Sequence, residues 1–261
     1  MQNITNLEIK YKDFIDDNNS ETIVILHGWW WKSDSWLKLG DLLFKSWFNV
    51  IIPDLPWFWE TKLDYVFDLD EYAKVIANFL RTLKIDNFIL WWHSNWWAIA
   101  IKIVKSNIFT IKTLVLNNSS WIRNDKKRSI KRKIFNFSSK IIKKLFNFIP
   151  SPLRRKLGWV QIRKKIYNFI WWSDYIKSEE IPFLKETYLN VISEDITEQI
   201  KKIDSNTLLI RWELDKYTPL SDAHFMRNNI KKSKLIIISN EWHSIHLKNP
   251  NLLVNKFLEN I

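Results

Sequence analysis

The stretch "ILWWHSNWWAIA", residues 89–100, places a serine between two pairs of tryptophans. The apolar run before it, "NFILWW" (87–92), is short and continuous, as in a strand buried on both faces of a sheet. The residues after it have helical spacing at Ile99, Ile103 and Val104. Ser94 is therefore expected in a sharp turn between strand and helix, whose backbone would hold its hydroxyl above the sheet. By itself, a serine in this place is more often a helix N-cap.

The alternation of strand and helix continues on both sides of this turn. Further strand-like runs are "TIVILH" (22–27), "FNVIIP" (48–53), "IKTLVLN" (111–117), "NTLLIR" (206–211) and "KLIIIS" (234–239). Helical patterns occupy residues 68–84, 220–230 and 250–260. Such alternation predicts an α/β fold with a doubly wound, mostly parallel sheet. The N-terminal residues 1–14 alternate polar and apolar side chains, which favours a strand over a signal peptide.

The middle of the chain differs, because no run typical of a parallel strand occurs between residues 121 and 190. The segment "SIKRKIFNFSSKIIKKLFNFIP" (129–150) instead has apolar residues at helical spacing. Between Arg123 and Lys165 there are 16 Lys or Arg and a single acid. We therefore expect core residues 1–120, an inserted helical cap at 121–190 and the second half of the core at 191–261.

Composition excludes several classes of protein. The chain has 261 residues, 46% of them hydrophobic, which excludes a disordered protein and is enough for one large domain. It contains no cysteine, so neither a disulfide framework nor a thiol nucleophile exists. No apolar run approaches the roughly 20 residues of a membrane span, and we expect a cytoplasmic protein. Ligand clusters for a metal or nucleotide cofactor are also lacking, so no cofactor is expected.

Three further segments supply groups that a serine nucleophile needs. In "LHGWWWKSDSW" (26–36), a His27-Gly28 pair leads a loop whose backbone N–H can point toward the nucleophile and help to form an oxyanion hole. Asp215 follows a strand in "LLIRWELDKYTPL", and His243 follows the last strand in "ISNEWHSIHLKNP". His27 itself is more suited to ordering its loop than to acting as a base. His246 is the rival base to His243.

The order Ser94, Asp215, His243 is the chain order of α/β-hydrolases, and the chain resembles an α/β-hydrolase-fold serine hydrolase of the esterase or lipase type along essentially its full length. The segments "PDLPWFWET" (53–61), "RWELDKYTP" (211–219) and "EWHSIHLKNP" (241–250) resemble family turns.

The resemblance implies a role for each residue. Ser94 would be the nucleophile, His243 the base and Asp215 the acid, with the backbone N–H groups of Trp29 and Asn95 as oxyanion donors. His27, Gly28 and His93 would shape the motif turns, and the insertion would be the cap that shapes the substrate pocket. No metal is implied.

One departure from the family pattern is consistent. The chain has 17 Trp and 3 Gly, and tryptophan stands where the family motifs have glycine. Counting turn-like and strand-entry positions as well, fourteen tryptophans fit glycine sites: Trp30, Trp31, Trp47, Trp57, Trp59, Trp91, Trp92, Trp96, Trp97, Trp121, Trp171, Trp172, Trp212 and Trp242. Only Trp29, Trp36 and Trp159 remain as expected indoles. A single event explains the pattern: UGA codons that the source organism decodes as glycine have been translated as tryptophan. The alternative is a genuine tryptophan-rich surface or carbohydrate platform.

The expected activity is hydrolysis of an ester or related acyl bond of a small or lipid-like substrate through an acyl-enzyme. Thioester, C–C and peptide bonds remain open, because fold and triad do not choose among them. Ser94 excludes the aspartate nucleophile of dehalogenase relatives. A non-catalytic binding protein on the same fold is the alternative class. The partner is expected to be a small acyl substrate and not a nucleic acid, although the basic cap could touch an anionic membrane surface.

Overall fold

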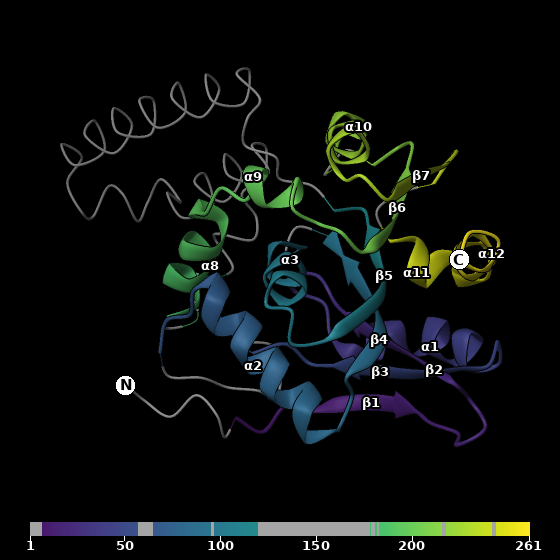
Figure 1. Ribbon diagram of the computed structural model, residues 1–261, viewed down its shortest axis with the longest axis horizontal. Helices are drawn as coiled ribbons and strands as arrows, with labels where there is room; N and C mark the ends of the chain where they lie inside the picture. Colours follow the sequence, from purple (N-terminus) through teal and green to yellow (C-terminus); the bar gives the residue numbers. More distant parts are fainter. Residues whose placement is uncertain are drawn as a thin grey trace, which may run out of the picture.

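The computed structural model describes residues 7–56, 65–94, 97–119, 178, 181, 183–215, 218–241 and 244–261. Within these ranges one sheet holds seven strands in the order β1-β3-β2-β4-β5-β6-β7 (Figure 1). The strands are β1 (Tyr11–Phe14), β2 (Glu21–Leu26), β3 (Phe48–Pro53), β4 (Asn87–His93), β5 (Thr110–Asn117), β6 (Asn206–Trp212) and β7 (Ser233–Ile238). β1 pairs antiparallel with β3, and all other pairings are parallel. The prediction of a mostly parallel sheet is therefore confirmed.

Helices cover both faces of the sheet (Figure 1). One face packs against α2 (Leu69–Thr82), α3 (Trp97–Lys105), α8 (Leu184–Ser193), α9 (Thr197–Ile200) and α10 (Leu220–Asn229). The other packs against η2 (Ser33–Trp36), α1 (Leu37–Phe44), α11 (Ile245–Lys248) and α12 (Pro250–Leu258). Alternate residues of each strand enter the two cores: Trp91 lies in the second and Trp92 in the first, as a period of two requires.

The helix predicted at 68–84 shows how local sequence sets an element. The Asp68 side chain accepts a hydrogen bond from the Glu71 backbone N–H, and the Glu71 side chain accepts one from the Asp68 backbone N–H, which forms a capping box. The apolar stripe of the helix then lies buried on the sheet at Leu69, Tyr72, Ala73, Ile76, Phe79 and Leu80. Capping and amphipathicity therefore agree on where α2 begins and which face it buries.

The expected cap, residues 121–190, lies mostly outside the described residues. The first continuous described segment after residue 119 begins at 183 and contains α8. Thr187 on α8 accepts a hydrogen bond from the Phe67 N–H at 3.0 Å, and Lys102 on α3 binds Asp70 at 2.9 Å and Glu194 at 2.7 Å. The expected boundary at 190/191 falls within α8. This helix is therefore tied to the core on either side of that boundary.

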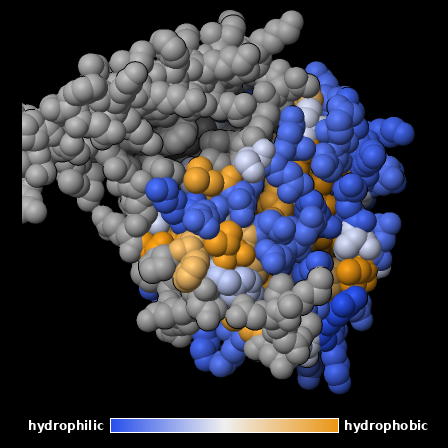
Figure 2. Space-filling view, turned by 90° about the vertical axis from the view of Figure 1, so that its left-hand side faces the viewer, coloured by the Kyte–Doolittle hydropathy of each residue, from blue (hydrophilic) through white to orange (hydrophobic). Residues whose placement is uncertain are grey.

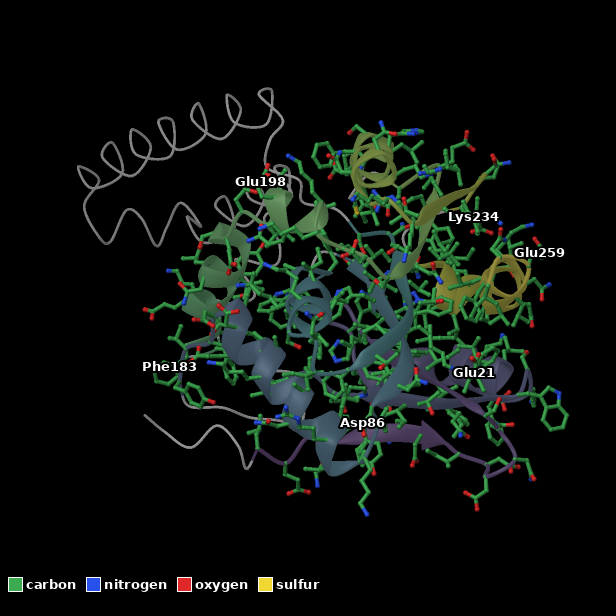
Figure 3. The ribbon with its side chains drawn as sticks, viewed as in Figure 1. Glu21, Asp86, Phe183, Glu198, Lys234 and Glu259 are labelled. Carbon is green, nitrogen blue, oxygen red and sulfur yellow. The ribbon has the colours of Figure 1, made fainter. Side chains whose placement is uncertain are left out.

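The described surface is largely polar. Figure 2 shows mostly hydrophilic side chains, with smaller hydrophobic groups between them. Charged residues such as Glu198, Lys234 and Glu259 lie at the periphery (Figure 3). Among the described residues, no helix is both long enough and apolar enough to cross a membrane.

Candidate active site

The candidate groups gather at one edge of the sheet, where the parallel strands end. Asp54 follows β3, His27 follows β2, Ser94 follows β4, Asn118 follows β5 and Asp215 follows β6. These strands are consecutive neighbours in the sheet, so the five residues form a row. The carboxyl edge is where open α/β sheets bind their ligands.

Ser94 lies in the turn that the sequence predicts. β4 ends at His93, α3 begins at Trp97, and Ser94 between them has φ 68°, in the left-handed region. A non-glycine residue pays for this conformation in strain, and such residues cluster at active sites. Ser94 is 7% exposed. The strand–turn–helix geometry matches that of a nucleophile elbow.

The loop after β2 lies directly against this turn. A Cβ atom added to Gly28 would lie 2.9 Å from the Ser94 Cβ and 3.1 Å from Nδ1 of His93. Only glycine fits such an approach, which explains the His27-Gly28 pair. Trp29, one expected oxyanion donor, follows at once in the chain. Asn95, the other, lies outside the described residues.

His27 orders this loop and is not placed as a base. Its Nδ1 donates to the Gly28 carbonyl at 2.9 Å, and its Nε2 accepts from the Leu55 N–H at 2.9 Å. Both contacts need the neutral ring, because a carbonyl can only accept and an N–H can only donate. Burial lowers the pKa of His27 to about 4, although the Gly28 carbonyl and the Asp54 charge act in the opposite direction. Both nitrogens of His27 are thus used within the fold.

The acid candidate has dense polar contacts. Oδ2 of Asp215 accepts from the Thr218 hydroxyl at 2.6 Å and from the Asn118 side-chain amide. Oδ1 accepts from the Thr218 backbone N–H at 3.3 Å. Asp215 is 7% exposed. Several donors thus converge on a buried carboxylate, an arrangement that suits the acid of a triad.

The buried guanidinium of Arg211 frames this acid pocket. Nη2 donates to the carbonyls of Thr218 and Pro219 at 3.0 Å each, and Nη1 donates to the carbonyl of Ser119. The Arg211 side chain therefore connects the segment after the C-terminal end of β5 to the loop that carries Asp215. Sequence reasoning missed Asn118, Thr218 and Arg211. The signal that could have revealed them is a set of polar residues at the ends of two apolar strand runs.

The rival base lies inside the second core. His246, on α11, is fully buried and stacks on Trp36 with ring centroids 4.1 Å apart and planes 5° apart. Its ring also lies 4.9 Å from the ring of His93. His243 lies outside the described residues, so its position in the triad stays a prediction.

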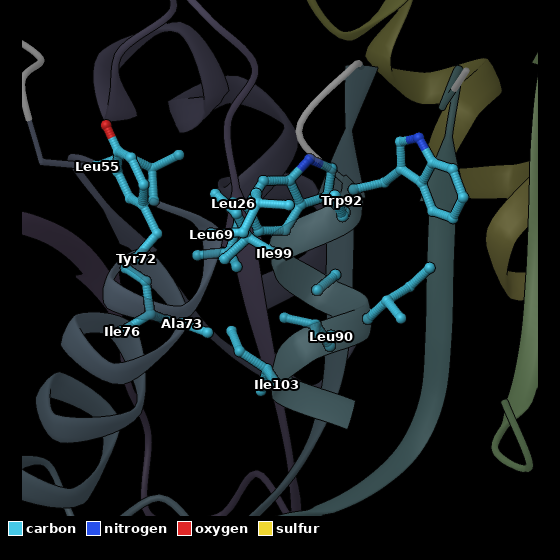
Figure 4. Close-up of a cluster of buried hydrophobic side chains, with 14 of the residues drawn as sticks. Leu26, Leu55, Leu69, Tyr72, Ala73, Ile76, Leu90, Trp92, Ile99 and Ile103 are labelled. Carbon is cyan, nitrogen blue, oxygen red and sulfur yellow. The ribbon is translucent and has the colours of Figure 1, made fainter. Parts of the chain in front are cut away.

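Buried tryptophans lie on both faces of the sheet next to the turn at Ser94. Trp91, Trp92 and Trp97 are fully buried, and Trp92 packs with Leu26, Leu90 and Ile99 (Figure 4). Within the described part of the chain, the indole nitrogens of Trp91, Trp92 and Trp212 have no hydrogen-bond partner. The indole nitrogen of Trp36 also lacks a partner, although Trp36 is one of the three residues expected to be genuine tryptophans. An unpaired buried indole nitrogen is therefore not restricted to the fourteen positions.

Among those of the fourteen tryptophans that the structure describes, two occupy left-handed positions. The Trp31 N–H bonds the Gly28 carbonyl at 3.1 Å and closes a turn whose third residue, Trp30, has φ 65°. Trp47 has φ 69° just after α1 and is 74% exposed. Glycine is the usual residue at both kinds of place, the third position of such a turn and the end of a helix.

Acidic side chains near the site have structural tasks. Asp54 accepts the Ser33 N–H at 2.7 Å, and Asp68 caps α2. Over the described ranges, no group of three or more His, Cys, Asp or Glu could hold a metal ion.

No protein-family model matches the chain. A curated relative, the "Uncharacterized hydrolase YugF" of Bacillus subtilis (strain 168), is 22% identical over 260 residues, which cover 93% of this chain and 90% of the relative. Among solved structures, the hydrolase olei00960 from Oleispira antarctica has a TM-score of 0.69 at 17% identity and covers 100% of this chain and 97% of its own. The esterase EaEST from Exiguobacterium antarcticum has a TM-score of 0.68 at 18% identity, with coverage of 96% and 94%.

These similarities agree with the sheet topology and the row of groups at its edge. The chain has the α/β-hydrolase fold, with a mostly parallel seven-stranded sheet in the residues described.

Proposed function

We propose that this protein is a serine hydrolase that cleaves an ester or related acyl bond of a small or lipid-like substrate. The observation that carries the proposal is the left-handed Ser94 between β4 and α3, with Gly28 in contact with it. A buried hydroxyl held in this strained turn suits a nucleophile better than an N-cap, because a capping residue usually takes an extended conformation. The relative named a hydrolase and the esterase of the same fold support the same class.

The proposed reaction has two halves. Ser94 Oγ attacks the acyl carbon while His243 takes its proton, and Asp215 stabilises the resulting imidazolium. The backbone N–H groups of Trp29 and Asn95 would stabilise the oxyanion. His243 then gives the proton to the leaving alcohol, and an acyl-enzyme remains. Water, deprotonated by His243, then attacks the acyl carbon. The bond between the acyl carbon and Ser94 Oγ breaks, His243 returns the proton to Oγ, and the acid is released.

We also propose that the fourteen tryptophans named above are glycines in the protein that the source organism makes, through UGA codons decoded as glycine. Trp30 and Trp47 support this, because both have the positive φ that glycine adopts without strain. Overpacking at the buried positions and strain at turns each cost about 1–3 kcal/mol per site. Several such costs would exhaust a stability of about 5–15 kcal/mol. The chain with glycine at all fourteen positions is called the glycine-restored chain below.

The codons test this second proposal without any protein. UGA codons at residues 57, 59, 92, 96, 212 and 242 are expected. UGG at most of these positions would refute it, and would favour a genuine tryptophan-rich surface.

Hydrolysis of short p-nitrophenyl esters tests the main proposal. Two parent chains are assayed: the printed chain, which has the sequence as given, and the glycine-restored chain. Each is compared with its Ser94→Ala variant and with Ser106→Ala, at an exposed serine directly after α3. Ser94→Ala should lower kcat by about 10⁶-fold and Ser106→Ala should leave it unchanged. Ester turnover that survives Ser94→Ala would contradict the proposal. An absence of turnover in both chains, with every acyl length tried, would favour the non-catalytic binding protein.

The basic insertion carries a separate proposal about partners. Its 16 Lys and Arg between Arg123 and Lys165 could attract an anionic lipid surface while the substrate stays a small acyl compound. Binding to anionic but not neutral vesicles, weakened by salt, is the expected result. Binding that is absent or insensitive to salt would reject it.

A further inference from the structure

We infer that Asn118 and Thr218 are positioning residues that set the orientation of the Asp215 carboxylate. The inference rests on the proposed function, because it assumes that Asp215 is the acid of the triad. It goes beyond that function by assigning tasks to two residues outside the proposed triad.

Asn118 connects the acid to a strand end through both ends of its amide. Its Oδ1 accepts the Trp212 N–H at 3.1 Å, and its Nδ2 donates to Oδ2 of Asp215. Because a backbone N–H can only donate, the amide oxygen must face Trp212 and the amide nitrogen must face the carboxylate. The Asn118 N–H also bonds the Ile210 carbonyl at 2.9 Å, so the backbone of Asn118 is held by β6 as well.

Thr218, three residues after Asp215, donates two hydrogen bonds to the same carboxylate. Its hydroxyl donates to Oδ2 at 2.6 Å and its backbone N–H to Oδ1 at 3.3 Å. Oδ2 thus takes both side-chain donors, and hydrogen bonds to a charged acceptor are the strong ones. Rotation of the carboxylate about its Cβ–Cγ bond would break both contacts. Oδ2 is therefore the anchored oxygen, and Oδ1 is the oxygen best suited to a histidine N–H.

Arg211 couples the two donors to each other. It donates to the carbonyl of Ser119, next to Asn118, and to the carbonyl of Thr218 itself. Asn118, Thr218 and Arg211 are each 1% exposed or less, so water competes little for these contacts. The arrangement holds both donors in one rigid frame around Asp215.

A turn requirement alone does not account for Asn118. Its φ of 47° is left-handed, but Asn107 and Asn240 have φ 51° and 60° and lie exposed on the surface. Asparagine tolerates this region wherever a turn needs it. What distinguishes Asn118 is its burial and its contact with the acid, and this makes Asn107 a matched control.

The experiment compares variants in the more active of the printed and glycine-restored chains. Asn118→Asp keeps an oxygen for the Trp212 N–H but sets a second carboxylate against Asp215, and Asn118→Gly keeps the turn but removes the donor. Thr218→Val removes the hydroxyl at nearly constant volume, and Thr218→Ser restores it. Asn107→Asp is the control. For each variant, kcat, KM, the pH profile of kcat/KM and the thermal unfolding midpoint are measured.

Asn118→Asp should lower kcat about 100-fold with little change in KM, because a misplaced acid misplaces the base. The acidic limb of its profile should move to higher pH, since two adjacent carboxylates retain a proton that one alone releases. Asn118→Gly and Thr218→Val should each lose about tenfold in kcat, and Thr218→Ser should recover most of it. Asn107→Asp should match the parent chain.

Two results together would overturn the inference. In the first, folded Asn118→Asp or Asn118→Gly has the same pH profile and the same kcat as Asn107→Asp. In the second, Thr218→Val and Thr218→Ser do not differ. If Asn118→Asp does not fold, Asn118→Gly and the Thr218 pair still decide. Ser94→Ala separates the two proposals: an active Ser94→Ala refutes the proposed function. An inactive Ser94→Ala beside normal Asn118 and Thr218 variants refutes the positioning alone.

Discussion

The two ends of the candidate site are built in opposite ways. On the acid side, at the ends of β5 and β6, Asn118, Arg211 and Thr218 surround Asp215 with short polar contacts. On the elbow side, at the ends of β2 and β4, bulky indoles stand around Gly28 and Ser94, and Trp30 takes a left-handed φ. Both sides lie on one edge of one sheet. The difference teaches that polar recognition needs specific side chains, whereas close backbone approach needs their absence.

The comparison also bears on the fourteen tryptophans. On the acid side the side chains that contact Asp215 are not among the fourteen, and their geometry is coherent as printed. On the elbow side, Trp30 occupies a left-handed turn position where glycine is the usual residue. We therefore expect a misreading of glycine to damage the elbow side more than the acid side.

On the acid side, the largest effect is expected from Asp215 itself. Asp215→Asn keeps the shape of the side chain but removes the charge that would stabilise the histidinium in the proposed mechanism, so kcat should fall about 10⁴-fold. Steady-state kinetics on a p-nitrophenyl ester measure it. Asp222→Asn, at a buried acid on α10, is the control for loss of a charge nearby. A kcat for Asp215→Asn no lower than that of Asp222→Asn would remove Asp215 from the triad.

Next in size is a contrast between two tryptophans in the printed chain. Trp36→Gly deletes a fully buried indole and should cost about 3–5 kcal/mol of unfolding free energy. Trp47→Gly should stabilise the chain by about 1 kcal/mol, because the exposed indole packs little and its φ of 69° strains a bulky residue but not glycine.

Urea unfolding of the two variants measures this contrast. Opposite signs are the expected result. Loss of stability in both would show that position 47 accommodates tryptophan as well as glycine, and would weaken the glycine proposal.

A smaller effect concerns the pH dependence of the elbow side. The folded chain keeps His27 neutral down to about pH 4, while the unfolded chain binds the proton near its ordinary pKa of 6.5. The stability contributed by neutral His27 is therefore complete above pH 6.5 and is lost as the pH falls toward 4, by about 3 kcal/mol. Urea midpoints across this range, compared for the parent, His27→Gln and the exposed His224→Gln, measure it. Only His27→Gln should flatten the decline, and an equally steep decline in that variant would refute the assignment.

Much of the fold could be predicted because it depends on local patterns. The apolar run at 48–53 matches β3 at both ends, and the run at 206–211 misses β6 by one residue. Parallel strands that are buried on both faces can be recognised in a sequence as continuous apolar segments. The sharp turn at Ser94 could also be predicted, because an apolar strand run and a helical pattern follow each other there with few residues between them; its left-handed φ was not predicted.

The contacts around Asp215 could not be predicted, because they join residues that are distant in the sequence. Asn118 and Asp215 are 97 positions apart, and Arg211 and Ser119 are 92 apart. Nothing in "NNSS" (117–120) distinguishes the asparagine that contacts the acid from its neighbour. Such pairings follow from the order of β5 and β6 in the sheet, which periodicity does not specify. The antiparallel pairing of β1 with β3 escaped prediction for the same reason.

The proposed activity requires Ser94 to be a nucleophile activated in a tight elbow. Labelling with a fluorophosphonate, followed by mass spectrometry of the peptides, identifies the activated residue. We expect one adduct, on the peptide that contains Ser94, formed faster in the glycine-restored chain than in the printed chain and absent from Ser94→Ala. An adduct on another residue, or no adduct on a folded glycine-restored chain, would contradict it.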